Sequence, residues 1–194
     1  MNVSKHTRPS RKAPVAAALL TFVSLAALAA CGGQPAKDAG GSAPATRTTR
    51  FTENGVTVTL SVSDWQASQG TLTAVFTPEA KGFHLYSTDL PPTGIEGVGR
   101  PTAMAVNGAL KARGRLTAGA DVRSISVPGV DAPVPVYPDG PVTTTLPVRA
   151  DTDGDATVLL GYASCSTQDG CTIPVSDHPV HLHVADDGPA FDAP

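Results

Sequence analysis

The sequence has little charge, few aromatic residues and only three cysteines. Charged residues make up 16% of the 194 positions, and the formal net charge is −3. Protein–nucleic acid contacts depend on basic side chains that neutralise phosphates, so this balance gives no reason to expect a nucleic-acid partner. The chain also lacks a glycine-rich phosphate-binding motif and a convincing Ser/His/Asp arrangement. No cofactor is therefore predicted, and whether the protein is an enzyme is left open.

Glycine and proline, by contrast, are abundant, with 19 and 18 residues. Both interrupt long helices, and no 12-residue window shows a convincing helical period with caps. This composition favours short strands joined by turns over a helical bundle. The length fits one domain with an extension.

Residues 1–30 indicate an export signal. Residues 1–12 contain four basic side chains and no acidic one, and an apolar run of about 16 residues follows over 15–30. This run is short for a transmembrane helix, which needs roughly 20 residues. It ends in Leu28-Ala29-Ala30-Cys31, which resembles the lipoprotein box of bacterial lipoproteins. That resemblance implies a lipoprotein signal peptide over 1–30, a lipid on Cys31 and an extracytoplasmic, membrane-anchored location. The alternatives are an ordinary signal peptide or a membrane anchor.

The rest of the chain divides into a linker, one β-rich domain and a tail. After Cys31, residues 32–50 contain no large apolar side chain. We therefore predict that 31–50 consists of the lipid-bearing Cys31 and a flexible linker. From Phe51 onward, apolar and polar residues alternate in short segments separated by turn residues, among them Gln69-Gly70. We therefore expect an all-β antiparallel sandwich over 51–186 and a disordered tail over 187–194. The expected strands are 56–62, 72–76, 83–87, 102–106, 121–127, 142–148, 157–163 and 178–184.

Cys165 and Cys171 flank a short loop that ends in Asp169-Gly170. A tight turn between two strands can bring their Cα atoms close to the ~4.4–6.8 Å that is usual for a disulfide. Closing so short a loop stabilises the fold by roughly 2.4 kcal/mol, a modest gain. The pair is therefore either a structural staple or an exposed, exchange-competent bond.

Two segments around these cysteines resemble one known family. They are 161–165 with 171–174 (GYASC…CTIP) and 81–87 (KGFHLYS). Together they resemble the N-terminal periplasmic domain of the thiol:disulfide interchange protein DsbD, over roughly residues 55–185. The resemblance implies an immunoglobulin-like sandwich that carries reducing equivalents. Its electron donor would be a membrane electron transporter or a thioredoxin-like protein, and its acceptors would be client thiol–disulfide oxidoreductases.

The resemblance also implies roles for individual residues. Cys171 would form mixed disulfides with partners, and Cys165 would be the resolving cysteine. Tyr86 matches a family tyrosine near the pair, and His84 replaces a second ring residue. In the family a short loop with an aromatic residue caps the cysteines, and the comparable stretch here, 130–136, contains no aromatic residue. Because neither transmembrane helices nor a CxxC motif is present, the donor is expected to be a separate protein.

A histidine cluster supports a different function. On a strand, His181 and His183 point to the same face, and Asp177 lies nearby in sequence. Two imidazoles at this spacing can bind copper or zinc. The favoured explanation of these histidines is the solvated polar face of an edge strand, so no metal site is predicted. A metal carrier and a non-catalytic scaffold lipoprotein with a structural disulfide remain the alternatives to thiol exchange.

Overall fold

The computed structural model describes residues 47–192, which form fifteen strands and no helix. Within that range, accordingly, no helix is long and apolar enough to cross a membrane. The signal peptide predicted over 1–30, the predicted lipid site Cys31 and most of the predicted linker lie outside the described residues.

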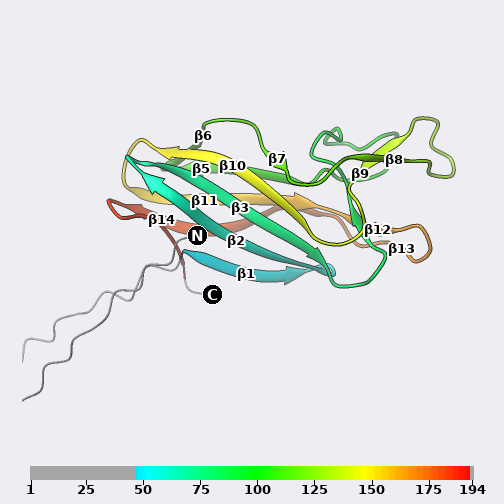
Figure 1. The fold of residues 1–194 in the computed structure, drawn as a ribbon, viewed down its shortest axis with the longest axis horizontal. Coiled ribbons are helices and arrows are strands. Elements are labelled where there is room, and N and C mark those ends of the chain that lie inside the picture. Colours follow the sequence, from blue (N-terminus) through cyan, green and yellow to red (C-terminus); the bar gives the residue numbers. More distant parts are fainter. Residues whose placement is uncertain (1–46, 193–194) are drawn as a thin grey trace, which may run out of the picture. The chain divides into compact units, whose positions relative to one another are not determined.

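Two antiparallel sheets form the body of the domain (Figure 1). The first sheet has the order β1-β2-β3-β10-β6, and the short strand β7 also pairs with β10. The second has the order β15-β14-β11-β5. The strands of the first sheet are β1 (Thr48–Glu53), β2 (Val56–Gln66), β3 (Gln69–Pro78), β6 (Leu110–Ala112), β7 (Thr117–Ala118) and β10 (Val142–Ala150). Those of the second are β5 (Ala103–Gly108), β11 (Gly154–Tyr162), β14 (Val175–Ala185) and β15 (Gly188–Phe191).

The sheets are held together by one apolar core. Alternate residues of β2, such as Val58 and Leu60, lie in the same buried cluster as Val158 and Leu160 of β11. Burial of one face of each sheet is what the period-two sequence pattern predicts. The expected class, an all-β, immunoglobulin-like antiparallel β-sandwich, is confirmed by this arrangement.

All eight predicted strands overlap strands of the structure, but one turn was misplaced. The β2–β3 hairpin turns at Ala67-Ser68, both in the left-handed region with φ of 48° and 59°, whereas Gln69-Gly70 begins β3. Alanine and serine rarely adopt positive φ, so their sequence did not indicate a turn. The turn was placed at Gln69-Gly70 instead because glycine adopts positive φ readily.

Both ends of the predicted domain also differ from expectation. The linker was predicted to extend to residue 50, but β1 begins at Thr48 and pairs with β2. The tail was predicted to be disordered over 187–194, but Gly188–Phe191 forms β15 beside β14. Phe191 is only 4% exposed and packs in the main core. A single buried aromatic residue and ladder hydrogen bonds therefore outweigh the acidic, turn-like character of this segment.

Two small sheets extend one end of the sandwich. One is β13 (Gly170–Cys171), β12 (Ser164–Ser166) and β4 (His84–Leu85), and the other pairs β8 (Arg123–Ile125) with β9 (Val134–Val136). They enclose a second apolar cluster, which contains Tyr86, Leu90 and Cys165. Both cysteines lie on the first of these small sheets.

Candidate functional site

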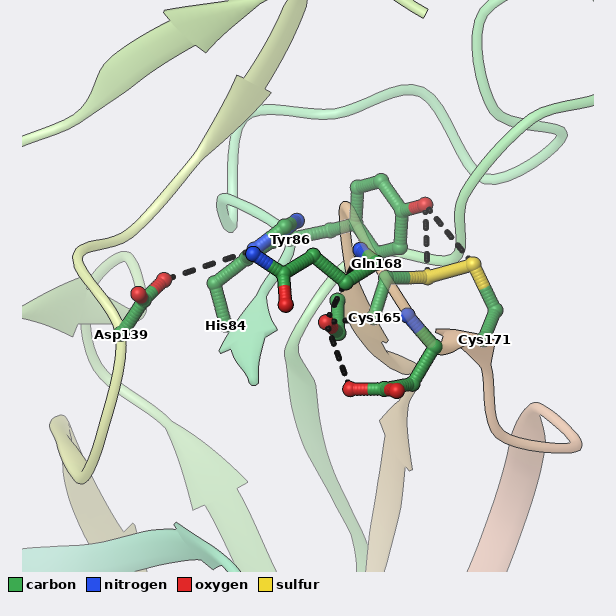
Figure 2. Close-up of polar contacts among 8 residues, drawn as sticks. His84, Tyr86, Asp139, Cys165, Gln168 and Cys171 are labelled. Atoms are coloured by element: carbon green, nitrogen blue, oxygen red, sulfur yellow. Dashed lines mark hydrogen bonds and ion pairs between the residues drawn. A yellow bond between two sulfur atoms is a disulfide. The ribbon is translucent and has the colours of Figure 1, made fainter. Parts of the chain in front are cut away.

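The two cysteines face each other across a tight hairpin. After β11 the chain passes through β12, turns at 167–169 and returns as β13, which places Cys165 directly opposite Cys171. The Ser166 hydroxyl accepts hydrogen bonds from the backbone N–H groups of Gln168 and Asp169, at 3.2 and 3.3 Å. This pattern stabilises the turn. The Cα atoms of the cysteines are 4.0 Å apart, and their sulfur atoms form a disulfide (Figure 2).

Strand β4 brings the two ring residues predicted for the site to the same place. His84 lies opposite Cys165 in the β4–β12 ladder. Side chains alternate along an extended chain, so His84 and Tyr86 share one face while Leu85 enters the main core. The rings of His84 and Tyr86 are perpendicular, with centroids 6.1 Å apart. The structure therefore brings together all four predicted residues, Cys165, Cys171, Tyr86 and His84.

The hydroxyl of Tyr86 contacts both sulfur atoms. Its oxygen lies 3.0 Å from the Cys165 Sγ and 3.8 Å from the Cys171 Sγ (Figure 2). Disulfide sulfur carries no hydrogen, so the hydroxyl is the donor. Burial raises the pKa of Tyr86 above its ordinary value, which keeps the phenol protonated and able to donate.

His84 is a buried neutral imidazole at neutral pH. Burial lowers its pKa, and this outweighs the opposing effect of Asp139, whose carboxylate lies 3.6 Å from Nδ1. Asp139 itself is largely exposed, so its carboxylate lies between the buried His84 ring and the solvent. Sequence analysis did not identify Asp139, because nothing in its local sequence marks it as a partner of His84.

An apolar cleft of about 280 Å³ opens beside the disulfide. One wall consists of the sulfur hairpin with His84 and Tyr86, and the other is aliphatic. The aliphatic wall is made by Val98, Ile125, Val127 and Pro128. Sequence analysis missed these residues because isolated aliphatic side chains in loops carry no distinctive pattern.

Two loops cover this side of the site and contact each other. In the stretch 130–136, Val134 and Val136 are buried in the same apolar cluster as Tyr86, while 125–128 is the stretch that lines the cleft. The second loop, 94–99, contributes Val98. The Glu96 carboxylate accepts a hydrogen bond of 3.1 Å from the backbone N–H of Asp131. The cover of the cleft is thus largely aliphatic and comes from two parts of the chain.

The two cysteines have unequal environments. Cys165 is 5% exposed and packs in the small apolar cluster, whereas Cys171 is exposed. An incoming thiolate attacks a disulfide sulfur along the sulfur–sulfur axis and displaces the other sulfur. Cys171 is therefore the sulfur that an incoming thiolate could reach, and the Tyr86 hydroxyl lies closest to the other sulfur, that of Cys165.

The histidine cluster lies elsewhere, on β14. His181 and His183 occupy the same exposed face, as predicted, but each Nδ1 contacts a residue of the neighbouring strand β11. These contacts join His181 to Thr157 at 3.2 Å and His183 to Asp155 at 2.8 Å. Over residues 47–192, no group of three or more His, Cys, Asp and Glu side chains is arranged to hold a metal ion.

Comparison with known proteins gives one similar solved structure to report. No protein-family model matches the chain, and no curated protein is significantly similar to it. Among solved structures, the chain is similar to the N-terminal domain of DsbD from Neisseria meningitidis in its reduced form. The two share 14% identity with a TM-score of 0.43, over 71% of this chain and 90% of that one.

Proposed function

We propose that this domain is a thiol–disulfide exchange module that works outside the cytoplasm. It passes reducing equivalents from a membrane electron transporter or thioredoxin-like donor to client oxidoreductases, through the Cys165–Cys171 pair. A lipid on Cys31 holds it at the cell membrane. The single observation that carries the proposal is the asymmetry of the disulfide, which pairs an exposed Cys171 with a buried Cys165 beside a hydroxyl donor.

A second observation supports it. The two sequence segments that resemble the DsbD N-terminal domain, 81–87 and 161–174, are about 80 residues apart in the chain. In the fold they meet, because β4 pairs with β12. A purely structural staple would need neither a ring residue in hydrogen-bond contact with its sulfur nor a cleft at its side.

The exchange proceeds in two displacements. A donor thiolate attacks the Cys171 Sγ, the Cys165–Cys171 bond breaks, and Cys165 leaves as a thiolate hydrogen-bonded by Tyr86. The second donor thiol then releases Cys171 and closes the donor's own disulfide, so two electrons have entered the pair. Reduced Cys171 attacks a client disulfide, and Cys165 resolves that mixed disulfide, passing the same two electrons on.

Matched single-cysteine variants test this assignment. Cys165→Ser leaves an exposed Cys171 without its resolving partner, so we expect it to accumulate a mixed disulfide with an oxidised thioredoxin-fold protein. Cys171→Ser leaves only the buried Cys165, so we expect little adduct. Non-reducing electrophoresis and mass spectrometry measure both. Equal capture by the two variants contradicts the asymmetric mechanism, and capture by neither favours the structural staple.

The lipid anchor needs its own test, since it concerns a different part of the chain. Expression of the full chain with Cys31→Ala should abolish incorporation of radiolabelled palmitate and release the protein from the membrane fraction. A labelled Cys31→Ala protein, or an unlabelled wild type, would contradict the anchor and leave the exchange mechanism untouched.

A further inference from the structure

His84 carries a buried ring nitrogen with no partner. The residue is 5% exposed, and among residues 47–192 nothing hydrogen-bonds to its Nε2. A buried polar atom without a partner destabilises a fold, so such an atom beside a reactive group indicates a use in another state of the protein. The exchange reaction as written above leaves this nitrogen without a role.

The tautomer of His84 follows from its other nitrogen. Nδ1 faces the Asp139 carboxylate at 3.6 Å, which favours the neutral form that carries its proton on Nδ1. Nε2 is then a bare acceptor. Figure 2 shows the order of the groups, with Asp139 on one side of His84 and with Tyr86 and the disulfide on the other.

The charged and titratable groups around His84 are few. Asp139 favours the imidazolium, and the positive charge of Arg123 on β8 disfavours it. Tyr86 is held protonated by burial, and the oxidised sulfur atoms are uncharged. Lys81 lines a surface pocket together with Asp139. Reduction of the disulfide is therefore the event that can add a negative charge on the cysteine side of the ring.

We propose that His84 takes up a proton when the disulfide is reduced, and that the resulting imidazolium holds one negative charge on the reduced sulfur pair. Asp139 is the positioning residue that orients the ring and stabilises the imidazolium from the solvent side. The inference rests on the proposed exchange function and adds to it the way in which a thiolate is kept available in an apolar site.

The protons and electrons balance. A dithiol donor gives two electrons and two protons, and becomes a disulfide. One proton remains on the reduced Cys165–Cys171 pair, leaving one sulfur as a thiolate, and the other proton is held at Nε2 of His84. When the pair reduces a client disulfide, both protons leave with the client's two thiols.

Imidazole NMR titration of the whole chain tests the proposal in the oxidised form and in the form reduced by dithiothreitol. Reduction should raise the proton affinity of His84 by about tenfold or more, the scale expected for a nearby opposite charge. His183 is the matched control, because its Nδ1 also faces a carboxylate, that of Asp155, but on a different face of the fold. Its titration should be the same in both forms.

A second measurement follows the thiolate directly. In the reduced protein, His84→Gln should lower the thiolate absorbance at neutral pH, and His183→Gln should leave it unchanged. Identical titration of His84 in the two redox forms would overturn the inference even if His84→Gln fails to fold. Because dithiothreitol reduces the pair without a protein partner, that result leaves the exchange function standing, whereas failure of the cysteine trap above would remove the function itself.

Discussion

The two sulfur atoms share one hydroxyl donor, that of Tyr86. A hydrogen bond to a developing thiolate lowers its pKa, and a thiolate of lower pKa leaves a disulfide faster. Tyr86→Phe keeps the ring that fills the small cluster and removes only the donor. We expect roughly tenfold slower reduction by a dithiol, a loss of about 1.4 kcal/mol in transition-state stabilisation. Stopped-flow kinetics measure the rate.

Tyr162 is the control for that substitution. It is also a buried tyrosine, but its hydroxyl donates to the Glu53 carbonyl instead of to sulfur. Tyr162→Phe should leave the reduction rate unchanged. Equal slowing in both variants would mean that general loosening of the fold, and not the hydrogen bond to Cys165, controls the rate.

His84 also makes stability depend on pH in the oxidised protein. Its pKa in the folded state is below the ordinary histidine value of 6.5, so on acidification the unfolded chain binds the proton first. Stability contributed by the neutral ring is therefore present above about pH 6.5 and is lost as the pH falls toward the folded-state pKa. Urea denaturation at mildly acidic and neutral pH should show a smaller acid loss for His84→Gln than for the wild type. The same loss in both proteins would contradict the buried, neutral assignment.

Prediction from sequence identified four residues that the fold brings together at the disulfide. Both cysteines, Tyr86 and His84 were identified from two short motifs, and the fold brings them together. Asp139 was missed as a partner of His84 because their contact joins strand β4 to the bend between β9 and β10, which are far apart in the sequence. A local sequence pattern does not indicate which side chains approach each other in the folded chain.

The β12–β13 hairpin is the element that sets the disulfide geometry. Gly170 has a φ of +84°, and a Cβ added there would meet nothing within 4 Å, so substitution acts through the backbone alone. Gly170→Ala costs about 1 kcal/mol in this left-handed conformation. Because the closed hairpin needs that conformation, we expect the thiol–disulfide equilibrium to shift about fivefold toward the reduced pair. Equilibration with a glutathione buffer measures the shift.

Gly82 provides the comparison for that hairpin substitution. It has a φ of +76° and equally open surroundings, but it lies before β4 rather than between the cysteines. Gly82→Ala should lower global stability by a similar amount and leave the redox equilibrium unchanged. A shift in both variants would show that the equilibrium follows overall stability and not the hairpin.

Among the elements, the long alternating strands were predictable, whereas most of the short strands were not, although β4 and β8 fall within the predicted ranges 83–87 and 121–127. Strands such as β2 and β10 carry several periods of alternation, which identify a half-buried strand without further information. The two-residue strands β7 and β13 have no period of their own and exist because a neighbouring strand pairs with them. β15 likewise forms because Phe191 packs in the main core, a tertiary contact that its local sequence does not indicate.

At the scale of the whole domain, the candidate site lies at one end of the β-sandwich and is covered by two loops. The cover is held together in part by the hydrogen bond between Glu96 and the Asp131 N–H. Glu96→Ala removes that bond, so we expect reduction of the disulfide by a small thiol to become a few fold faster as the cover loosens. Glu96→Gln keeps an acceptor oxygen and should behave as the wild type. A rate unaffected by Glu96→Ala would show that the cover does not limit access.

The all-β sandwich was predictable because glycine, proline and period-two segments all favour it. The cover of the site was not predictable from the sequence. Its aliphatic residues come from segments around 98 and 125–128, which approach the cysteines only in the folded chain. The predicted cysteine pair and ring residues therefore lie together in the fold, beside an aliphatic wall that the sequence did not indicate.

The reduction potential of the Cys165–Cys171 pair tests the central claim most directly. Purified full-length protein is equilibrated with glutathione and dithiothreitol buffers of known potential, and the fraction of free thiol is measured after acid quenching and alkylation. An exchange module requires a potential above about −300 mV, within the range of known thiol–disulfide carriers. A potential far below about −300 mV would identify a structural disulfide and contradict the proposed function.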